Sequence, residues 1–175
     1  MKTAIIGFSG SGKSTLAQKI GAYEKADVLH LDSVHFLPNW EIRAKEEKEK
    51  IVGDFLDSHD SWVIDGNYTK LFYERRMEEA DRIVMLLFNR FACLRRVVKR
   101  YRRYKNLTRP DMAEGCPEKL DGEFVLWVLF GGRKRAARKR YKKLRETYPE
   151  KTVVLKNQRE LDAFWKEIGS RPAKE

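Results

Sequence analysis

The sequence predicts an α/β fold in which a five-stranded parallel sheet carries helices on both faces. Five short apolar segments have strand character, and apolar residues at helical spacing fill the intervals between them. Strands that alternate with helices form parallel sheets, because each crossover helix returns the chain to the same edge. A glycine-rich segment, residues 7–15, directly follows the first strand. Ligands of such sheets bind at the carboxyl ends of the strands, so the residues after each strand are candidates for a site.

The strands are expected at about residues 2–7, 27–31, 61–65, 82–88 and 152–155. Between the second and third strands, the segment 43–59 has an apolar stripe at helical spacing, formed by Ile51, Val52, Phe55 and Leu56. After the fourth strand, a second stripe is formed by Leu94, Val97, Val98 and Tyr101. Both segments are therefore predicted to be helices that pack against the sheet.

A chain of 175 residues can form one domain with a sizeable core, and no Pro/Gly/Ser-rich linker or internal repeat divides it. We therefore expect a single domain over residues 1–175. The longest apolar run, residues 124–130, is too short to span a bilayer, and the N-terminus leads into the glycine-rich segment rather than into a signal peptide. These features predict a cytoplasmic protein without a membrane partner.

The cysteines and histidines form no pattern typical of a disulfide framework or a metal site. Cys93 falls in a predicted helix and Cys116 in a loop, and without a C-x-x-C sequence both are expected to be free thiols. His30, His35 and His59 are scattered along the chain. Each is expected to be a core or surface residue, because no second ligand stands at helical i, i+4 spacing beside it.

The segment GFSGSGKST, residues 7–15, matches the pattern G-x-x-x-x-G-K-[ST] in full. It joins a strand to a helix, which distinguishes a phosphate-binding loop (P-loop) from a Gly/Ser turn that matches by chance. Lys13 is expected to act near the β- and γ-phosphates of ATP, and Ser14 to coordinate Mg²⁺. The loop residues expected to bind ATP are Ser9, Gly10, Ser11, Gly12, Lys13, Ser14 and Thr15.

Five segments in order along the chain resemble the bacterial DNA topology modulation proteins, which are adenylate-kinase-related P-loop proteins. These segments are GFSGSGKST, VLHLD, WVIDGNY, RIVMLLFNRFACLRRVVKR and TRPDMAEGCPEKLD. The resemblance implies a strand order of 2-3-1-4-5 and ATP-dependent phosphoryl transfer. Within the wider nucleoside monophosphate kinases, IDGNY is similar to the LDGFPR element after the third strand, and Arg96 and Arg100 are similar to the Arg-x-x-x-Arg that opens a mobile lid. The family name reports an association with DNA and not a reaction.

The positive charge of the chain is concentrated in two segments. The net charge is +11, yet residues 95–109 and 133–145 hold 17 of the 37 Lys and Arg and no acid, which leaves 20 basic against 26 acidic residues elsewhere. On the predicted helix, Arg96, Arg100 and Arg103 share one face. We expect a basic helical lid at about residues 100–140, with Arg96 contacting the nucleotide and Arg100 and Arg109 stabilising the transferring phosphoryl group. The alternative is a solvated basic face or a nucleic-acid surface.

Two aspartates follow predicted strands. Asp65 ends the third strand and would lie beside the P-loop in the implied strand order, where it could hold the Mg²⁺. Asp32 follows the second strand, where small-molecule kinases with a shikimate-kinase-like layout place an acid that binds the acceptor hydroxyl. We expect Asp32 to accept the proton of that hydroxyl in catalysis. The alternative for each is a helix cap or a turn residue.

One position departs from the monophosphate kinase pattern. The arginine that grips the acceptor phosphate in those enzymes is matched here by Thr69, with Lys70 beside it. Lysine is a point charge without the bidentate fork of arginine, so adenylate as acceptor is in doubt unless Lys70, Arg43 or Arg75 compensates. Trp40 is interpreted either as a residue that stacks on an acceptor ring or as a loop anchor.

Two classes of function remain. The first is a small-molecule kinase, similar to the nucleoside monophosphate kinases, that transfers the γ-phosphoryl group of MgATP to an unidentified acceptor. The second is an ATP-dependent DNA- or RNA-binding protein that affects DNA topology and holds a phosphate backbone with its basic segments. We favour the kinase, with only weak nucleic-acid binding through the basic lid, because the basic segments fall where a lid would be and not in a terminal tail.

Overall fold

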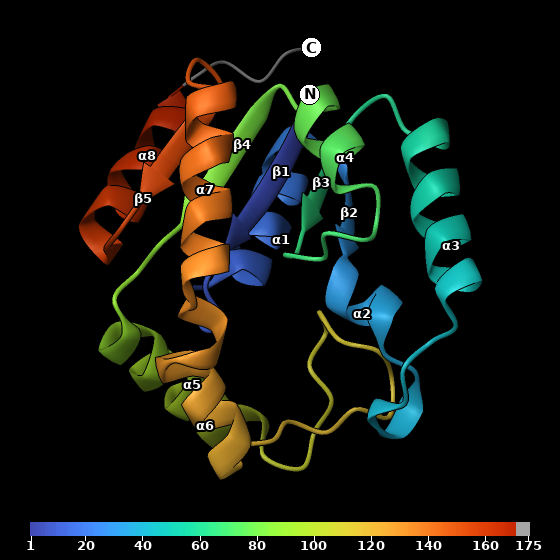
Figure 1. The fold of residues 1–175 in the computed structure, drawn as a ribbon, viewed down its shortest axis with the longest axis vertical. Helices are drawn as coiled ribbons and strands as arrows, with labels where there is room; N and C mark the ends of the chain where they lie inside the picture. Colours follow the sequence, from blue (N-terminus) through green and yellow to red (C-terminus); the bar gives the residue numbers. More distant parts are fainter. Residues whose placement is uncertain (171–175) are drawn as a thin grey trace.

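A computed structural model describes residues 1–170, so residues 171–175 of the expected domain lie outside the described part of the chain. Five strands form one parallel sheet in the order β2-β3-β1-β4-β5 (Figure 1). Their bounds are Lys2–Gly7 (β1), Asp27–His30 (β2), Trp62–Asp65 (β3), Arg82–Leu86 (β4) and Thr152–Leu155 (β5). The predicted fold class and the implied strand order are therefore confirmed, with each strand within two residues of its expected bounds.

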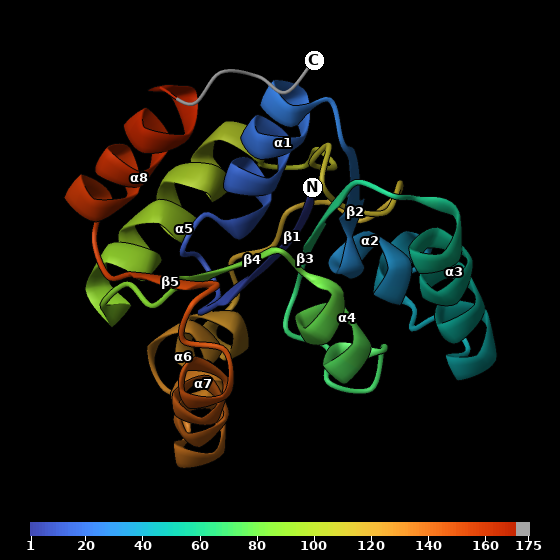
Figure 2. The same cartoon turned by 90° about the horizontal axis from the view of Figure 1, so that it is seen from above.

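Helices cover both faces of the sheet (Figure 2). One face carries α1 (Lys13–Glu24), α5 (Arg90–Tyr104) and α8 (Gln158–Ser170). The other carries α4 (Tyr73–Glu79), α6 (Gly122–Leu129) and α7 (Arg135–Thr147), while α2 (Leu31–His35) and α3 (Lys45–Ser58) lie beyond the β2 edge. Two short 3₁₀ helices, η1 (Pro38–Trp40) and η2 (Gly131–Arg133), complete the described elements.

The sheet is the centre of the apolar core. Every residue of β3 and β4 is buried, as expected for strands with helices on both faces. Helix α7 turns Tyr141 and Leu144 inward and leaves most of its Lys and Arg in solvent. Arg133, just before α7, is buried and donates to the carbonyls of Val128 (3.0 Å) and Phe88 (2.9 Å), so this member of the second basic segment supports the fold.

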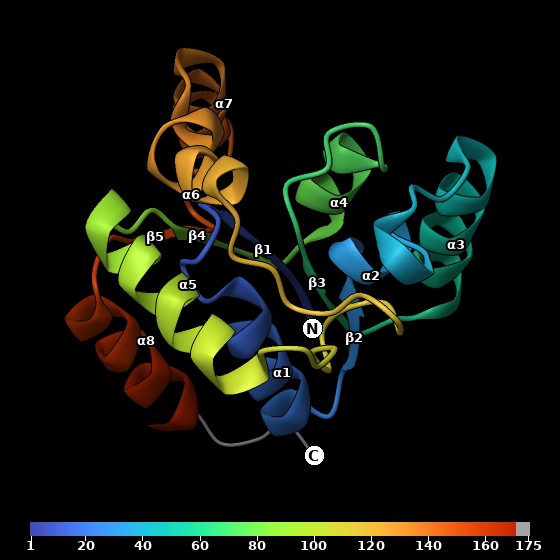
Figure 3. The ribbon, with the colours of Figure 1, turned by 90° about the horizontal axis from the view of Figure 1, so that it is seen from below.

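The parallel register brings the carboxyl ends of three strands together. Ile5 of β1 and His30 of β2 are both in register with Asp65 of β3. Figure 3 looks onto this edge of the sheet, with α2 on one side and α5 and α6 on the other. The P-loop leaves β1 at the same edge, so residues far apart in sequence are gathered at one place.

A loop between α5 and α6, residues 105–121, crosses this edge and docks on η1 (Figure 3). The Asn39 N–H donates to the carbonyl of Gly115 (2.9 Å), and the Trp40 indole donates to the carbonyl of Pro117 (3.2 Å). The Cys116 thiol donates to the carbonyl of Leu37 (3.1 Å). These contacts join the two sides of the sheet edge and anchor Trp40, which also lines the cleft.

Both cysteines are free, as expected, and both are buried. Within residues 1–170, no helix combines the length and the apolar character needed to cross a membrane.

The first strand ends at a glycine that no other residue can replace without strain. Gly7 has a φ of 141°, and a Cβ built on it would lie 2.3 Å from the carbonyl oxygen of Leu86. We expect Gly7→Ala to lower the free energy of unfolding by about 2–3 kcal/mol, measured by urea denaturation. Gly122→Ala is the control, because a Cβ at Gly122 meets nothing within 4 Å. Equal urea midpoints for Gly7→Ala and Gly122→Ala would show that a side chain at Gly7 causes no strain.

Candidate active site

An open cleft of about 1910 Å³ lies along the carboxyl edge of the sheet. It collects most of the residues that the sequence singled out, and those that line it are Ser9, Gly10, Gly12, Lys13, Ser14, Thr15, Asp32, Arg96, Arg100 and Arg109. Ser11 is fully buried behind this surface, and Asp65 is buried in contact with Ser14. The elements that supply these residues are the P-loop, β3, α2, α5 and the loop 105–121.

The conformation of the P-loop depends on its glycines and on its packing against α5. Gly10 has a φ of 74°, and a Cβ there would lie 2.6 Å from Cγ2 of Val97. Asn67 fixes the start of the loop through two hydrogen bonds with Gly7: its Nδ2 donates to the Gly7 carbonyl (2.6 Å), and its Oδ1 accepts from the Gly7 N–H (3.0 Å). The loop is therefore held in place by the segment after β3 and by α5.

Lys13 points back into the loop, where its Nζ donates to the carbonyl of Phe8 (3.2 Å). Burial lowers the pKa of Lys13, and the carboxylates of Asp32 and Asp65 oppose this shift. Both aspartates are thus close enough for their charges to act on the lysine, which gathers the predicted catalytic lysine and both predicted acids around one point.

Asp65 lies at the end of β3 and bonds with both of its oxygens. Its Oδ2 accepts from the Ser14 hydroxyl (2.9 Å), and its Oδ1 pairs with Nδ1 of His30. It therefore caps no helix, and the turn interpretation does not describe its contacts. A serine hydroxyl and a carboxylate are hard oxygen donors of the type that Mg²⁺ prefers, and Mg²⁺ at nucleotide sites takes one or two protein ligands together with phosphate oxygens. The pair Ser14 and Asp65 fits that donor set.

Within residues 1–170, no group of three or more His, Cys, Asp and Glu side chains is placed to hold a metal on its own. A metal held by Ser14 and Asp65 would need further oxygen ligands from outside these two side chains.

Asp32 lies in α2, two residues after the end of β2. Its Oδ1 accepts from the Tyr68 hydroxyl (2.8 Å), and it makes no side-chain cap for the helix. Burial is the main cause that raises the pKa of Tyr68, and the charge of Asp32 adds to it, so this phenol stays a hydrogen-bond donor. The Tyr68 and His35 rings lie 4.7 Å apart and form an aromatic wall beside Asp32.

Arg96 of α5 connects the P-loop to the start of α8. Its guanidinium donates to the Ser11 carbonyl and to the Gln158 side chain, and its Cζ lies 4.1 Å from the centre of the Phe88 ring. Arg96 therefore lies at the P-loop and faces the cleft, the position expected of a nucleotide-contacting residue.

Arg100 and Arg109 meet at a buried carboxylate that the sequence did not single out. Arg100 Nε donates to Glu118 Oε1 (2.8 Å), Arg109 Nε pairs with Glu118 Oε2, and Arg109 Nη1 donates to Asp111 (2.7 Å). The Glu118 side chain is 2% exposed. Burial is the main cause that lowers the pKa of Arg100, and the like charge of Arg109 adds to this shift, which shows how close the two cations lie. Glu118 thus holds two arginines together at the wall of the cleft.

The basic residues proposed to compensate for Thr69 are mostly committed elsewhere. Arg75 pairs with Asp57 and Glu79, and Arg43 donates to the carbonyl of Val34 (2.9 Å). Lys70 is exposed and lines the cleft. Of the three candidates, Lys70 alone lines the cleft.

Three further residues shape the site: His30, Asn67 and Glu118. His30 was expected to be an ordinary core or surface histidine, and the structure places it against Asp65 instead. The feature of the sequence that could have indicated this contact is the position of His30 near the end of a predicted strand. Asn67 and Glu118 lie inside DGNY and TRPDMAEGCPEKLD, segments that the sequence comparison had already marked, but their partners are too distant in sequence to be read from either segment.

Comparison with known proteins supports the fold and leaves the family open. No protein-family model matches the chain, and no curated protein matches it in sequence. Among solved structures, the chain is similar to a deoxyadenosine kinase from M. mycoides with bound dATP, at 15% identity over 97% of this chain and 100% of that chain, with a TM-score of 0.56. A second match, an uncharacterized protein from Eubacterium ventriosum ATCC 27560, has 14% identity over 98% of this chain and 100% of that chain, with a TM-score of 0.47. The fold is therefore that of a P-loop kinase.

The contact between His30 and Asp65 makes the stability of the metal-free protein depend on pH. Burial opposes the charged imidazole, but the hydrogen bond and charge of Asp65 outweigh it and raise the pKa of His30 above 6.5. The stabilisation is present below the unfolded pKa and is lost as the pH rises through the folded pKa. We expect the difference in free energy of unfolding between wild type and His30→Gln to be larger near about pH 6 than near about pH 9, by urea denaturation in EDTA.

The Asp65→Asn variant lacks the charged partner of His30. In that variant, the change in free energy of unfolding caused by His30→Gln should depend little on pH. A difference between wild type and His30→Gln that stays constant across the pH range would show that the pair does not stabilise the fold through charge.

Proposed function

We propose that this protein is an ATP-dependent phosphotransferase, similar to the nucleoside monophosphate kinases, that transfers the γ-phosphoryl group of MgATP to the hydroxyl or phosphate oxygen of a small acceptor. The observation that carries the proposal is the Ser14–Asp65 hydrogen bond of 2.9 Å beside Lys13. A P-loop serine in contact with an acid from the neighbouring strand is the arrangement by which P-loop NTPases hold Mg²⁺.

In this proposal each residue has a separate task. The P-loop N–H groups and Lys13 bind the β- and γ-phosphates, and Arg96 holds the nucleotide from the α5 side. Ser14 and Asp65 hold the Mg²⁺ that accompanies ATP, which when bound neutralises phosphate charge. The Arg100–Arg109 pair faces the position where charge develops on the transferring group.

Asp32 receives the acceptor in this proposal. Its Oδ1 is engaged by Tyr68, so Oδ2 accepts the hydroxyl of an alcohol acceptor and takes its proton. The acceptor oxygen forms a bond to the γ-phosphorus as the bond to the bridging β,γ-oxygen breaks, and ADP leaves with the bridging oxygen. A phosphate acceptor is already ionised and needs no such base, in which case Asp32 orients it through a ribose hydroxyl.

The resemblance to the DNA topology modulation proteins supports a second candidate, a nucleic-acid-binding protein driven by ATP. The feature that favours it is α7, whose solvent face carries most of the second basic segment. In the first basic segment, Arg100 and Arg109 are paired with a buried acid at the cleft, while most of the other cations are exposed. Because Arg100 and Arg109 are held at the cleft next to the P-loop, we favour the kinase, together with weak nucleic-acid binding to the exposed cations.

The kinase assignment is tested by a screen of nucleosides, nucleotides and other hydroxylated metabolites with radiolabelled ATP and Mg²⁺. We expect transfer to at least one acceptor by wild type and its loss in Lys13→Ala, because the loop backbone cannot replace the lysine charge. Lys19→Ala, an exposed lysine on the helix that follows the loop, is the control and should keep the activity. Unchanged MgATP binding by calorimetry and unchanged transfer in Lys13→Ala would rule out this role for the P-loop.

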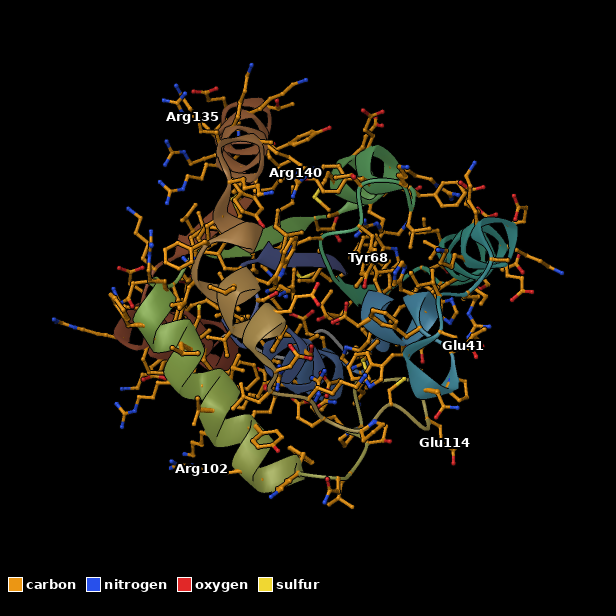
Figure 4. All side chains as sticks on the ribbon, turned by 60° about the horizontal axis from the view of Figure 1, so that its bottom comes forward. Glu41, Tyr68, Arg102, Glu114, Arg135 and Arg140 are labelled. Atoms are coloured by element: carbon orange, nitrogen blue, oxygen red, sulfur yellow. The ribbon has the colours of Figure 1, made fainter. Side chains whose placement is uncertain are left out.

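The arginines distinguish the two functions. Arg100→Lys and Arg109→Lys keep the charge next to Glu118 but lose the fork, so we expect turnover to fall by about 10²-fold or more with little change in MgATP affinity. Arg102→Lys, exposed on the far side of α5 (Figure 4), should behave as wild type. Turnover is measured by steady-state kinetics and MgATP affinity by calorimetry.

The same variants are then tested for DNA binding as a function of salt. Here the two arginines are replaced by alanine, because lysine would keep the charge that contacts a phosphate. For a nucleic-acid clamp, each phosphate contact removed would reduce the slope of log affinity against log salt by about 0.7–0.9. Normal ATP turnover combined with the loss of tight, salt-dependent DNA binding in Arg100→Ala and Arg109→Ala would favour the nucleic-acid function over the kinase.

A further inference from the structure

A buried carboxylate lies between the two arginines that the proposed function assigns to the transferring phosphoryl group. Oε1 of Glu118 accepts from Nε (2.8 Å) and Nη2 (2.7 Å) of Arg100, and Oε2 pairs with Nε of Arg109. Arg100 comes from α5, whereas Arg109 and Glu118 come from the loop 105–121. One side chain therefore holds two guanidinium groups that belong to different parts of the fold.

The backbone that carries Glu118 is itself fixed. The Glu118 N–H donates to the carbonyl of Leu107 (3.0 Å), and a β-bridge pairs Glu118 with Lys105. The carbonyl of the preceding residue, Pro117, accepts from the Trp40 indole of η1 (3.2 Å). The carboxylate thus stands on backbone that is held both within its own loop and from η1.

An acid between the two arginines offsets the repulsion between their charges. Burial is the main cause that lowers the pKa of Arg100, the like charge of Arg109 adds to this shift, and the charge of Glu118 opposes it. The pKa of Lys13 is lowered chiefly by burial, and the charge of Arg100 adds to that shift as well. The cluster is therefore within electrostatic reach of the P-loop lysine.

The location of this cluster separates it from an ion pair that supports the fold. Arg82 pairs with Glu24 at 2.8 Å, and neither residue lines the cleft. Arg100, Arg109 and Glu118 all line it. Because a buried ion pair contributes little to stability compared with apolar packing, the position of the cluster at the cleft favours a role in function.

We propose that Glu118 is a positioning residue for phosphoryl transfer, which holds Arg100 and Arg109 in the geometry that stabilises the transferring group. This inference rests on the proposed function and adds to it a residue that acts only through the two arginines. Donors that are fixed before the reaction need no reorganisation when charge develops on the phosphoryl oxygens. The negative charge of Glu118 opposes the binding of ATP, so its benefit lies in turnover and not in nucleotide affinity.

The test uses Glu118→Gln, which keeps the shape of the side chain and removes its charge. The amide oxygen still accepts from one arginine, but the amide NH₂ meets the N–H donor of the other, so the pair opens. We expect turnover to fall by about 10- to 100-fold. Affinity for MgATP should stay the same or rise by up to about 5-fold, because an acid near the phosphates is removed. Turnover is measured by steady-state kinetics with the acceptor found in the screen, and affinity by calorimetry with a non-hydrolysable ATP analogue.

Two further variants separate positioning from a structural role. Glu114→Gln makes the same change of charge at an exposed residue on the outer side of the same loop (Figure 4), and it should behave as wild type. Glu118→Asp keeps the charge between the arginines and withdraws the carboxylate by the length of one C–C bond. It should unfold near the wild-type temperature and bind MgATP as wild type, yet lose about 10-fold or more in turnover. This variant decides the question if Glu118→Gln does not fold.

The positions of the arginines can also be measured without any activity, by NMR of their side-chain Nε–H groups. In wild type, these groups of Arg100 and Arg109 should exchange slowly with solvent, because both are bonded to a buried carboxylate. In Glu118→Gln, exchange should become at least about 10-fold faster at one or both arginines.

The inference is overturned if Glu118→Gln and Glu118→Asp both keep wild-type turnover, or if the two Nε–H groups already exchange rapidly in wild type. It is also overturned if turnover, MgATP affinity and thermal stability fall together, because Glu118 would then support the fold alone. A chain that transfers phosphate to no acceptor would end the kinase proposal instead, and the NMR measurement would still show whether Glu118 holds the two arginines.

Discussion

The register of β3 beside β1 and β2 is the constraint on which the site depends. Parallel pairing sets Asp65 against Ile5 on one side and His30 on the other, and the P-loop begins two residues after Ile5. The carboxylate can therefore bond to Ser14 with one oxygen and to His30 with the other. A slip of one residue in β3 would turn Asp65 to the opposite face of the sheet and separate these groups.

The second organising feature is the way in which buried arginines are paired. Arg109 and Arg100 share Glu118, Arg82 meets Glu24, and Arg133 is satisfied by carbonyls. Each of these cations is held in one geometry, as positioning or structural roles require. Arg140 differs from them because it lies against the rings of Tyr73 and Tyr141 and pairs with no acid among residues 1–170.

The sequence was sufficient for those parts of the site that are local in the chain. The P-loop is one continuous segment with a strand before it and a helix after it, so its pattern could be read directly, and the alternating strands and helices predicted the parallel sheet. The strand order required a resemblance, because apolar periodicity does not say which strands are neighbours. His30 and Glu118 could not be assigned roles from sequence, because their partners lie far away in the chain.

The positions of the side chains show which residues of the two basic segments line the cleft and which lie in solvent. In sequence, residues 95–109 and 133–145 are two similar basic runs. In space, the first segment divides into Arg96, Arg100 and Arg109 at the cleft and exposed cations such as Arg95 and Arg102, and the second divides into a buried Arg133, Arg140 at the cleft and an exposed outer face. The exposed cations of both segments are available to attract polyanions without regard to sequence. At the cleft, Arg96, Arg100 and Arg109 are each held by a carbonyl or a carboxylate, an arrangement suited to individual phosphate groups rather than to a continuous backbone.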